Sequence, residues 1–300
     1  MRRVEMKRVL VAGATGYLGK YVVRELKKQG YYTKVLVRNN NKLDEHGTFQ
    51  EPVIRKYVDE IAIGDITKPN TIKNVCENID YVFTSVGITN RQRGTTFKDV
   101  DLQGNVNLLK EAEQSNIKSF MYIHVFTNNV WKQPGPLIEA KEQFINILKS
   151  SIVDHIIIRP TGYFSDLTQF LMMAKKGKVY LIGNGKSKMN PIHGEDLAQF
   201  CVHSLSTKNV TLDIGGPEIL TFQQMALYAF EALGKQKKTA HIPKFLLKPV
   251  SFGLKIFNNY YFGIFQFFMN VMTHDLIAPK YGKHTLKNFY KNFHKNEKAI

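Results

Sequence analysis

Three glycines between a short apolar run and an amphipathic helix constrain this chain more than any other feature. Residues 8–13 (RVLVAG) form a β-branched apolar run that predicts a strand, and Gly13, Gly16 and Gly19 follow it. The next residues place apolar side chains on one helical face, and residues 34–38 (KVLVR) repeat the strand signal. Strand, tight turn, helix and strand together predict a parallel βαβ unit with a right-handed crossover.

The strand signal then recurs along the first half of the chain, mostly with helical segments between the strands. The short apolar runs lie at residues 61–64, 81–85, 120–125 and 155–159. Alternating strands and helices predict a doubly wound α/β fold with a parallel sheet covered on both faces. We place this domain at residues 1–160 and expect residues 161–300 to form a smaller C-terminal substrate lobe, interleaved with the sheet edge.

The lobe is expected to contain a helix at residues 167–175, a strand pair formed by residues 179–182 and 189–192, and further helices. At the end of the chain, lysines recur every four residues opposite an apolar stripe, which predicts a basic amphipathic helix. The lysines are Lys283, Lys287, Lys291 and Lys295, and the stripe is Leu286, Phe289, Tyr290 and Phe293. Either this helix packs on the lobe as an ordinary surface helix, or it docks on an anionic membrane together with the aromatic-rich residues 257–268.

The composition is that of a globular chain with a strong positive charge. Of 300 residues, 43% are hydrophobic, and the formal net charge is +17. This charge favours anionic partners, but no recognition module for nucleic acid accompanies it, so we expect no nucleic acid partner. Cys76 and Cys201 stand apart, and no signal-peptide pattern precedes the first strand. We therefore expect a cytoplasmic protein, peripheral to the membrane if the C-terminal segment docks on lipid.

The glycine spacing predicts a site for the pyrophosphate of a dinucleotide. The first glycine permits the tight turn, the second lets the backbone approach the phosphates, and the third lets helix and strand pack closely. The N-terminus of the helix adds donors and the positive end of its dipole. The residues assigned to this site are Gly13, Thr15, Gly16, Tyr17, Leu18 and Gly19.

Arg38 stands nineteen residues after Gly19, at the end of the second predicted strand. An NAD-preferring site would have an acidic residue there to accept hydrogen bonds from the ribose 2'-hydroxyl. A guanidinium instead suits a 2'-phosphate, and no acid adjoins it. The sequence therefore predicts NADP(H) as the cofactor.

Two further loops follow strands at the same edge. Asp65 and Ile66 follow the third strand, where the carboxylate could accept from the adenine amino group or serve as a turn residue. Ser85 and Gly87 follow the fourth strand, where their small size would let the backbone pass close to the cofactor. We assign all four to cofactor binding.

Six runs together resemble the atypical short-chain dehydrogenase/reductase family, in particular its NAD(P)H-binding branch with NmrA-like and divinyl chlorophyllide reductase-like proteins. The runs are residues 13–19, 36–39 (LVRN), 64–67 (GDIT), 100–109 (VDLQGNVNLL), 158–164 (IRPTGYF) and 190–198 (NPIHGEDLA). The resemblance covers most of the chain and implies a Rossmann fold and an NAD(P)H cofactor. It implies little about the substrate.

The usual catalytic set of this family is a Ser after the fifth strand and a Tyr four residues before a Lys. Lys141 matches the Lys, whereas the Tyr position is Leu137 and the Ser position is His124. The resemblance implies that Lys141 holds the nicotinamide ribose and that the loop from Pro160 lies against the nicotinamide. His124 is either a proton donor or a structural residue, and Tyr163 is either a donor or a packing residue.

His193 comes before Gly194-Glu195-Asp196, which predicts a helix start with acidic residues in its first turn. We assign no metal, because no second His, Cys or acid stands at ligand spacing in the sequence. The first functional hypothesis is an NADPH-dependent reductase of an unidentified small molecule, for which a hydrophobic compound is one candidate. The second is a non-catalytic NADP(H)-binding regulator or assembly factor, which the missing Ser and Tyr favour.

Overall fold

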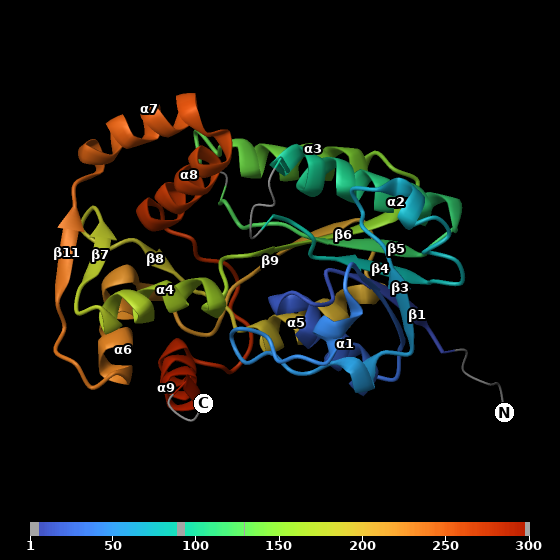
Figure 1. Ribbon diagram of the computed structural model, residues 1–300, viewed down its shortest axis with the longest axis horizontal. Helices are drawn as coiled ribbons and strands as arrows, with labels where there is room; N and C mark the ends of the chain where they lie inside the picture. Colours follow the sequence, from blue (N-terminus) through green and yellow to red (C-terminus); the bar gives the residue numbers. More distant parts are fainter. Residues whose placement is uncertain (1–5, 89–93, 129, 298–300) are drawn as a thin grey trace. The chain divides into compact units, whose positions relative to one another are not determined.

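The computed structural model describes residues 6–88, 94–128 and 130–297. Its main sheet has seven strands in the order β3-β2-β1-β4-β5-β6-β9 (Figure 1). The pairs β1–β2, β1–β4, β2–β3, β4–β5 and β5–β6 are parallel. The strands are β1 (Arg8–Ala12), β2 (Tyr32–Val37), β3 (Glu60–Ile63), β4 (Tyr81–Thr84), β5 (Ser119–Ile123), β6 (Asp154–Pro160) and β9 (Val210–Ile214). The predicted doubly wound α/β fold is confirmed; β9 was not predicted.

Helices cover both faces of this sheet. Figure 1 shows α2 (Asn105–Gln114) and α3 (Pro136–Lys149) on one face, and α1 (Tyr17–Lys28) and α5 (Gly194–His203) on the other. Strands β1, β4 and β5 are almost wholly buried because side chains on both of their faces meet helices. The order of strands reverses at β1, whose neighbours are β2 and β4, so ligands of such a fold bind beyond the carboxyl ends of β1 and β4.

The chain divides into two compact and interleaved units. Unit 1 comprises residues 1–124, 140–159 and 197–212, and unit 2 comprises residues 125–139, 160–196 and 213–300. One crossing lies between residues 159 and 160, one residue before the predicted domain boundary, and the chain crosses between the units at four other points. Residues 1–5, which precede the first strand, lie outside the described residues.

Unit 2 contains three packed helices and two small sheets. The helices are α4 (Phe164–Lys175), α6 (Phe222–Ala232) and α9 (Leu286–Glu297). One sheet pairs β7 (Val179–Ile182) with β11 (Thr239–Ile242), and the other pairs β8 (Lys188–Met189) with β10 (Leu220–Thr221). The predicted pairing of residues 179–182 with 189–192 is wrong. Gly183 donates its N–H to Ile242, which continues the β7–β11 ladder and keeps β7 from turning back onto β8.

The apolar stripe of α9 is part of the interior of unit 2. Leu286 and Tyr290 are fully buried, and the Tyr290 hydroxyl donates to the carbonyl of Leu167 at 2.6 Å. The helix is thus an ordinary surface helix, and its stripe is not available to a membrane. Two further helices, α7 (Lys248–Phe257) and α8 (Asn259–Thr273), pack against each other. Within the described ranges, no helix is long and apolar enough to cross a membrane.

Candidate cofactor site

The glycine turn between β1 and α1 has the geometry that its sequence predicts. Gly13 has φ +84°, a conformation that favours glycine, and its carbonyl accepts the N–H of Gly16 at 3.0 Å. A Cβ on Gly19 would lie 2.1 Å from the Gly13 carbonyl oxygen, so only glycine lets α1 approach the turn this closely. A Cβ on Gly13 would likewise lie 2.9 Å from the Ser85 hydroxyl, which places Ser85 beside the turn.

The start of α1 is open to an anion. Its N-cap is Gly16, which offers no side-chain cap, and its first turn holds no acidic residue. Thr15 is half-buried and Gly16 exposed, whereas Leu18 is only 3% exposed, so that its side chain belongs to the core. The Tyr17 ring packs edge-on against Tyr21, with centroids 5.7 Å apart. Of the predicted residues here, Leu18 can contribute only through its backbone.

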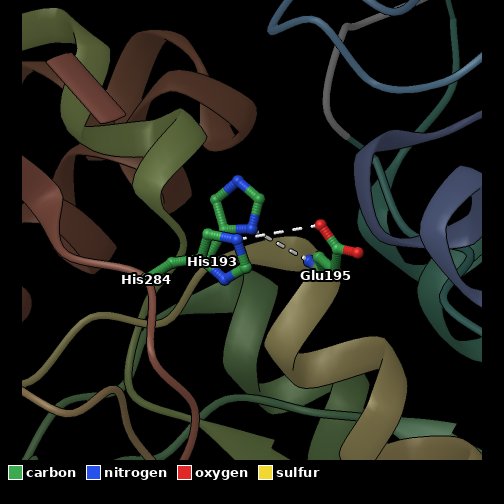
Figure 2. A group of neighbouring side chains, drawn as sticks. All are labelled: His193, Glu195 and His284. Carbon is green, nitrogen blue, oxygen red and sulfur yellow. Dashed lines mark hydrogen bonds and ion pairs between the residues drawn. The ribbon is translucent and has the colours of Figure 1, made fainter. Parts of the chain in front are cut away.

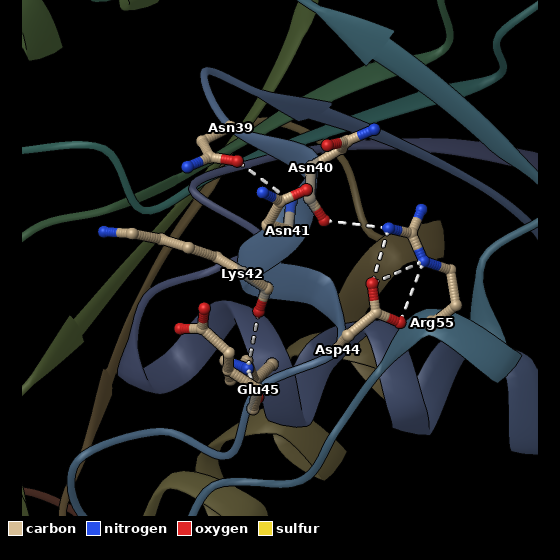
Figure 3. A network of polar contacts seen from close by, with 8 residues as sticks. Asn39, Asn40, Asn41, Lys42, Asp44, Glu45 and Arg55 are labelled. Atoms are coloured by element: carbon tan, nitrogen blue, oxygen red, sulfur yellow. Dashed lines mark hydrogen bonds and ion pairs between the residues drawn. The ribbon is translucent and has the colours of Figure 1, made fainter.

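Arg38 is exposed and directly follows β2. Figure 3 shows the polar contacts that hold the loop after it in place. Asn39 caps the next turn by accepting the N–H of Asn41 at 2.9 Å. Arg55 binds the Asp44 carboxylate through Nε and Nη2 at 2.8 to 3.2 Å and donates to the Asn40 carbonyl at 2.9 Å. This hydrogen-bonded pairing lowers the pKa of Asp44.

A buried lysine of α1 holds the same loop through two hydrogen bonds to its backbone. Lys20, 2% exposed, donates to the carbonyls of Lys42 (3.1 Å) and Glu45. Burial lowers the pKa of Lys20, while Glu51 and Glu45 oppose that shift. Because the backbone of Lys42 is held, its exposed side chain extends from an ordered loop, as Figure 3 shows. Neither Lys20 nor Lys42 was predicted as a site residue from the sequence.

Asp65 takes the turn role that was one of its two alternatives. Its Oδ1 accepts the N–H of Thr67 at 2.9 Å and the Thr67 hydroxyl at 2.8 Å. Ile66 is 6% exposed and lies in the core, and its carbonyl accepts from Asn107 at 2.8 Å. The predicted contact of Asp65 with adenine stays a prediction.

Lys141 lies in an internal ion pair. Its Nζ is 2.9 Å from Asp101 Oδ1 and 3.5 Å from the Tyr122 hydroxyl, and Asp101 and Tyr122 are fully buried. Burial alone would lower the pKa of Lys141, but Asp101 and Tyr122 outweigh it and raise that pKa. Burial also raises the pKa of Tyr122 to about 12. A Cβ on Gly87 would lie 2.6 Å from Asp101 Oδ1, so Gly87 adjoins this pair.

Asp101 reaches this position from a π-helix, Lys98–Gly104, that leads into α2. Such helices are rare and often lie at functional sites. The Asp101 carboxylate also accepts the N–H of Ile88 at 3.1 Å, which ties the loop after β4 to the pair. Asp101 belongs to one of the motifs that carry the family resemblance, but no role was predicted for it. One signal was available: Lys141 lies on the apolar stripe of α3 with Ile138 and Phe144, and a lysine there needs a buried partner.

His124 follows β5 and forms a second internal pair. Its Nε2 is 2.8 Å from Glu142 Oε1, and the residue is 3% exposed. Among the described residues, its buried Nδ1 has no hydrogen-bond partner. Burial lowers the pKa of His124 and Glu142 opposes this, whereas the bond from His124 lowers the pKa of Glu142. The neutral ring thus donates from Nε2 to Glu142 and leaves Nδ1 as an acceptor that can take up a proton.

Pro160 and Tyr163 belong to unit 2, so their predicted contact with the nicotinamide stays a prediction. The buried Pro160 accepts the N–H of Phe126 at 2.9 Å. Tyr163 is the extended N-cap residue of α4, has no side-chain cap bond, and pairs with Ile192. Its half-buried ring is compatible with either a donor or a packing role.

His193 has neighbours that the sequence spacing did not reveal (Figure 2). Its ring stacks on His284 with centroids 4.3 Å apart, and His284 Nε2 is 3.8 Å from Glu195 Oε2. The premise that no second ligand stands near is therefore wrong, because His284 arrives from 91 positions later. His193 Nδ1, however, accepts the N–H of Glu195 at 3.2 Å, which places the ring proton on Nε2. The Nδ1 lone pair of His193 is thus already used by a backbone N–H at the start of α5.

The fold and the turn define an NAD(P)-binding protein of the Rossmann class. Within that class the chain belongs to the NAD(P)H-binding family, which matches residues 13–208. The resemblance found in the sequence motifs is confirmed by the relatives.

Two relatives in sequence and one solved structure are similar to this chain over most of its length. The chain is 28% identical to the photosystem II assembly factor Ycf39 of Trieres chinensis, covering 88% of this chain and 78% of the relative. It is 26% identical to the chloroplastic divinyl chlorophyllide a 8-vinyl-reductase of Arabidopsis thaliana, with 94% and 75% covered. The NADPH-dependent quinone oxidoreductase QOR2 of Escherichia coli, solved with NADPH, shares the fold with a TM-score of 0.68 at 15% identity, with 95% and 99% covered.

Proposed function

We propose that the protein is an NADPH-dependent oxidoreductase of the atypical short-chain type that reduces a small, hydrophobic molecule. The observation that carries this proposal is the open glycine turn, where Gly13 has φ +84° and Gly19 has no room for a side chain, followed at the next strand end by the exposed Arg38. The relatives support it, since they include a vinyl-reductase.

Cofactor preference is assigned to the loop after β2. Arg38 would bind the 2'-phosphate through its guanidinium, and Lys42 would add a second positive charge from the same loop. The residues between them are Asn39, Asn40 and Asn41, so no carboxylate repels a phosphate there. The Arg55–Asp44 pair and Lys20 keep this loop ordered. Cofactor binding would therefore carry only a small cost in loop entropy.

Proton chemistry is assigned to His124. A bound NADPH would supply the hydride, so the protein has to supply a proton and orientation. His124 has its Nδ1 without a partner among the described residues, and Glu142 stabilises the protonated ring from the other side. Lys141 and Tyr163 remain candidates, although Lys141 would have to leave Asp101 to bind a ribose.

The test is a titration of the purified protein with NADPH, NADP+, NADH and NAD+, followed by NADPH oxidation with enones, quinones and vinyl-tetrapyrroles. We expect NADPH to bind at least about tenfold more tightly than NADH. Oxidation should depend on one class of acceptor, and His124→Gln should abolish it while leaving the NADPH affinity unchanged. Equal binding of NADPH and NADH would contradict the assignment of Arg38.

A second function is favoured by the internal pairing of Lys141. With Leu137 in place of the usual Tyr, and Lys141 held by Asp101, the ordinary catalytic set is incomplete. A relative at 28% identity is an assembly factor. We infer a non-catalytic NADP(H)-binding regulator as the alternative. Tight binding of NADP+ and NADPH, without turnover on any acceptor, would favour this alternative over the reductase.

A further inference from the structure

The segment between Glu231 and Asp275 contains no acidic residue. It contains six lysines, which are Lys235, Lys237, Lys238, Lys244, Lys248 and Lys255. No other charged residue type occurs there apart from two histidines, so the charge of the segment has one sign. A partner that matches this segment must therefore be anionic.

Helix α7 lies in this segment, and none of its residues is buried. Lys248, Phe252, Lys255 and Ile256 stand at positions i, i+4, i+7 and i+8, which share one face of a helix. All four are exposed, Phe252 by 69% and Ile256 by 62%. The face thus combines large apolar side chains with flanking lysines.

Two other phenylalanines extend the apolar surface at the ends of this helix. Phe245, just before α7, is 66% exposed, and Phe257, its last residue, is 86% exposed. The opposite side of α7, with Ser251 and Leu254, is only partly exposed, and the helix packs on α8 (Figure 1). The exposed face is therefore presented on a helix that is already anchored, and soluble proteins rarely expose contiguous apolar surface without a function.

We propose that α7 docks on an anionic lipid bilayer. It lies parallel to the surface, with Phe252 and Ile256 at the boundary of the acyl chains and Lys248 and Lys255 at the lipid phosphates. The uniform positive charge selects lipid over a protein partner, because a protein groove for this face would have to combine apolar walls with a continuous acidic rim. The proposal moves the predicted membrane contact from α9, whose stripe is buried, to α7. It does not depend on the proposed oxidoreductase activity.

The experiment is flotation of the full chain with two kinds of vesicle, one of phosphatidylcholine alone and one that also contains about 30 mol% phosphatidylserine. We expect binding only to the anionic vesicles and its loss at high salt. K248E/K255E should lower the partition coefficient at least about tenfold. The matched control, K110E/K149E, makes the same charge change on exposed lysines of α2 and α3 and should bind within about twofold of the wild type.

Insertion is tested separately from adsorption. F252S/I256S should weaken binding to anionic vesicles at least about tenfold, whereas Ile152→Ser, at an 85% exposed position outside the segment, should not. Unchanged NADPH affinity in these variants shows that they fold and that cofactor binding is independent. Binding that is insensitive to lipid charge, or that K110E/K149E weakens as much as K248E/K255E, would overturn the proposal. So would self-association that F252S/I256S relieves, which would assign the face to a second copy of the chain.

Discussion

The loop after β2 and the α3 side of the sheet use their charges in opposite ways. After β2, Arg38 and Lys42 form no ion pair with any of the described residues, and the polar contacts of the loop are made by their neighbours. On the α3 side, Lys141 and Glu142 are paired with the buried residues Asp101 and His124. The first region thus leaves two cations exposed, as the proposed cofactor contact requires, whereas the second pairs its cation and its acid with buried residues and leaves only His124 Nδ1 without a partner among the described residues.

This difference shows which region of the chain differs from the usual pattern of the short-chain reductases that its sequence resembles. The glycine turn and the loop after β2 have the features expected of a site for a phosphorylated cofactor, which are positive φ at Gly13, no room for a side chain at Gly19, and the exposed Arg38. The α3 side has the Lys of the usual catalytic set but Leu137 and His124 at the positions of the Tyr and the Ser, and its Lys141 is paired with the fully buried Asp101. If the Lys141–Asp101 pair is needed for stability, the regulator hypothesis is favoured. If the pair can be broken without loss of stability, Lys141 is free to bind the cofactor and the reductase hypothesis is favoured.

The largest expected effect tests whether Lys141 is held. Lys141→Met should lower the free energy of unfolding by about 3–5 kcal/mol, because it leaves the Asp101 carboxylate buried without its partner. D101N/K141M should recover much of that loss. The control is Lys118→Met, which removes a partly exposed pair with Asp80 and should cost less than about 1 kcal/mol. Urea unfolding measures all three, and equal stability of Lys141→Met and Lys118→Met would mean that the α3 side is not clamped.

The next effect tests the glycine turn. Gly19→Ala should weaken NADPH at least about hundredfold, since its Cβ would lie 2.1 Å from the Gly13 carbonyl oxygen and force the turn open. Gly30→Ala is the control: Gly30 has positive φ, unlike Gly19, but nothing lies within 4 Å of its would-be Cβ. It should cost about 1 kcal/mol of stability and leave the affinity within about twofold. Calorimetric titration would decide, and similar affinities for the two variants would contradict the role of Gly19.

The two regions also differ in how far the sequence predicts them. The glycine turn and Arg38 are local signals, because the turn, the helix start and the strand end lie within 31 residues of one another. The pairs Lys141–Asp101 and His124–Glu142 join residues 40 and 18 positions apart, and their formation depends on how α3 and the π-helix pack on β5. Sequence alone offered only the position of Lys141 on an apolar stripe.

The same distinction explains the errors in unit 2. The pairing of β7 with β11 joins strands separated by about 60 residues, and no local pattern encodes it. His284 reaches His193 from even farther along the chain. By contrast, α9 was predicted from its periodicity, and only its surroundings could decide between a buried stripe and a membrane contact.

A smaller effect concerns the preference between the cofactors. Arg38→Ser should reduce the ratio of NADPH to NADH affinity about tenfold to hundredfold, because a charge-assisted contact to the 2'-phosphate is lost while NADH is unaffected. Lys42→Ser should reduce the ratio by less, because its side chain starts one turn further along the loop. Lys110→Ser, on α2, is the control and should leave the ratio unchanged. A ratio that Arg38→Ser does not alter would place the 2'-phosphate elsewhere.

The smallest effect asks whether His124 can take up a proton. Burial lowers the pKa of His124 and Glu142 opposes this, so Glu142→Gln should lower that pKa further. Because the folded pKa lies below the ordinary value of about 6.5, the unfolded state binds more protons in the interval between them. The stability of the protein should therefore fall as the pH drops below about 6.5, and His124→Gln should flatten that slope.

Histidine NMR over pH 4–8 (roughly the range that brackets this group) would measure the titration directly. Lys141 and Arg159 also lower the pKa of His124. The control for Glu142→Gln is therefore Lys149→Gln, which removes another charge from α3. The Lys149 charge lowers the pKa of Glu142 and is not among the groups that shift the pKa of His124. A His124 resonance that titrates near its ordinary value and ignores Glu142→Gln would mean that the pair does not form. If Glu142→Gln shifts the His124 resonance and Lys149→Gln does not, the interior holds His124 neutral and Glu142 favours its protonation. A proton donor that acts together with hydride transfer requires both properties.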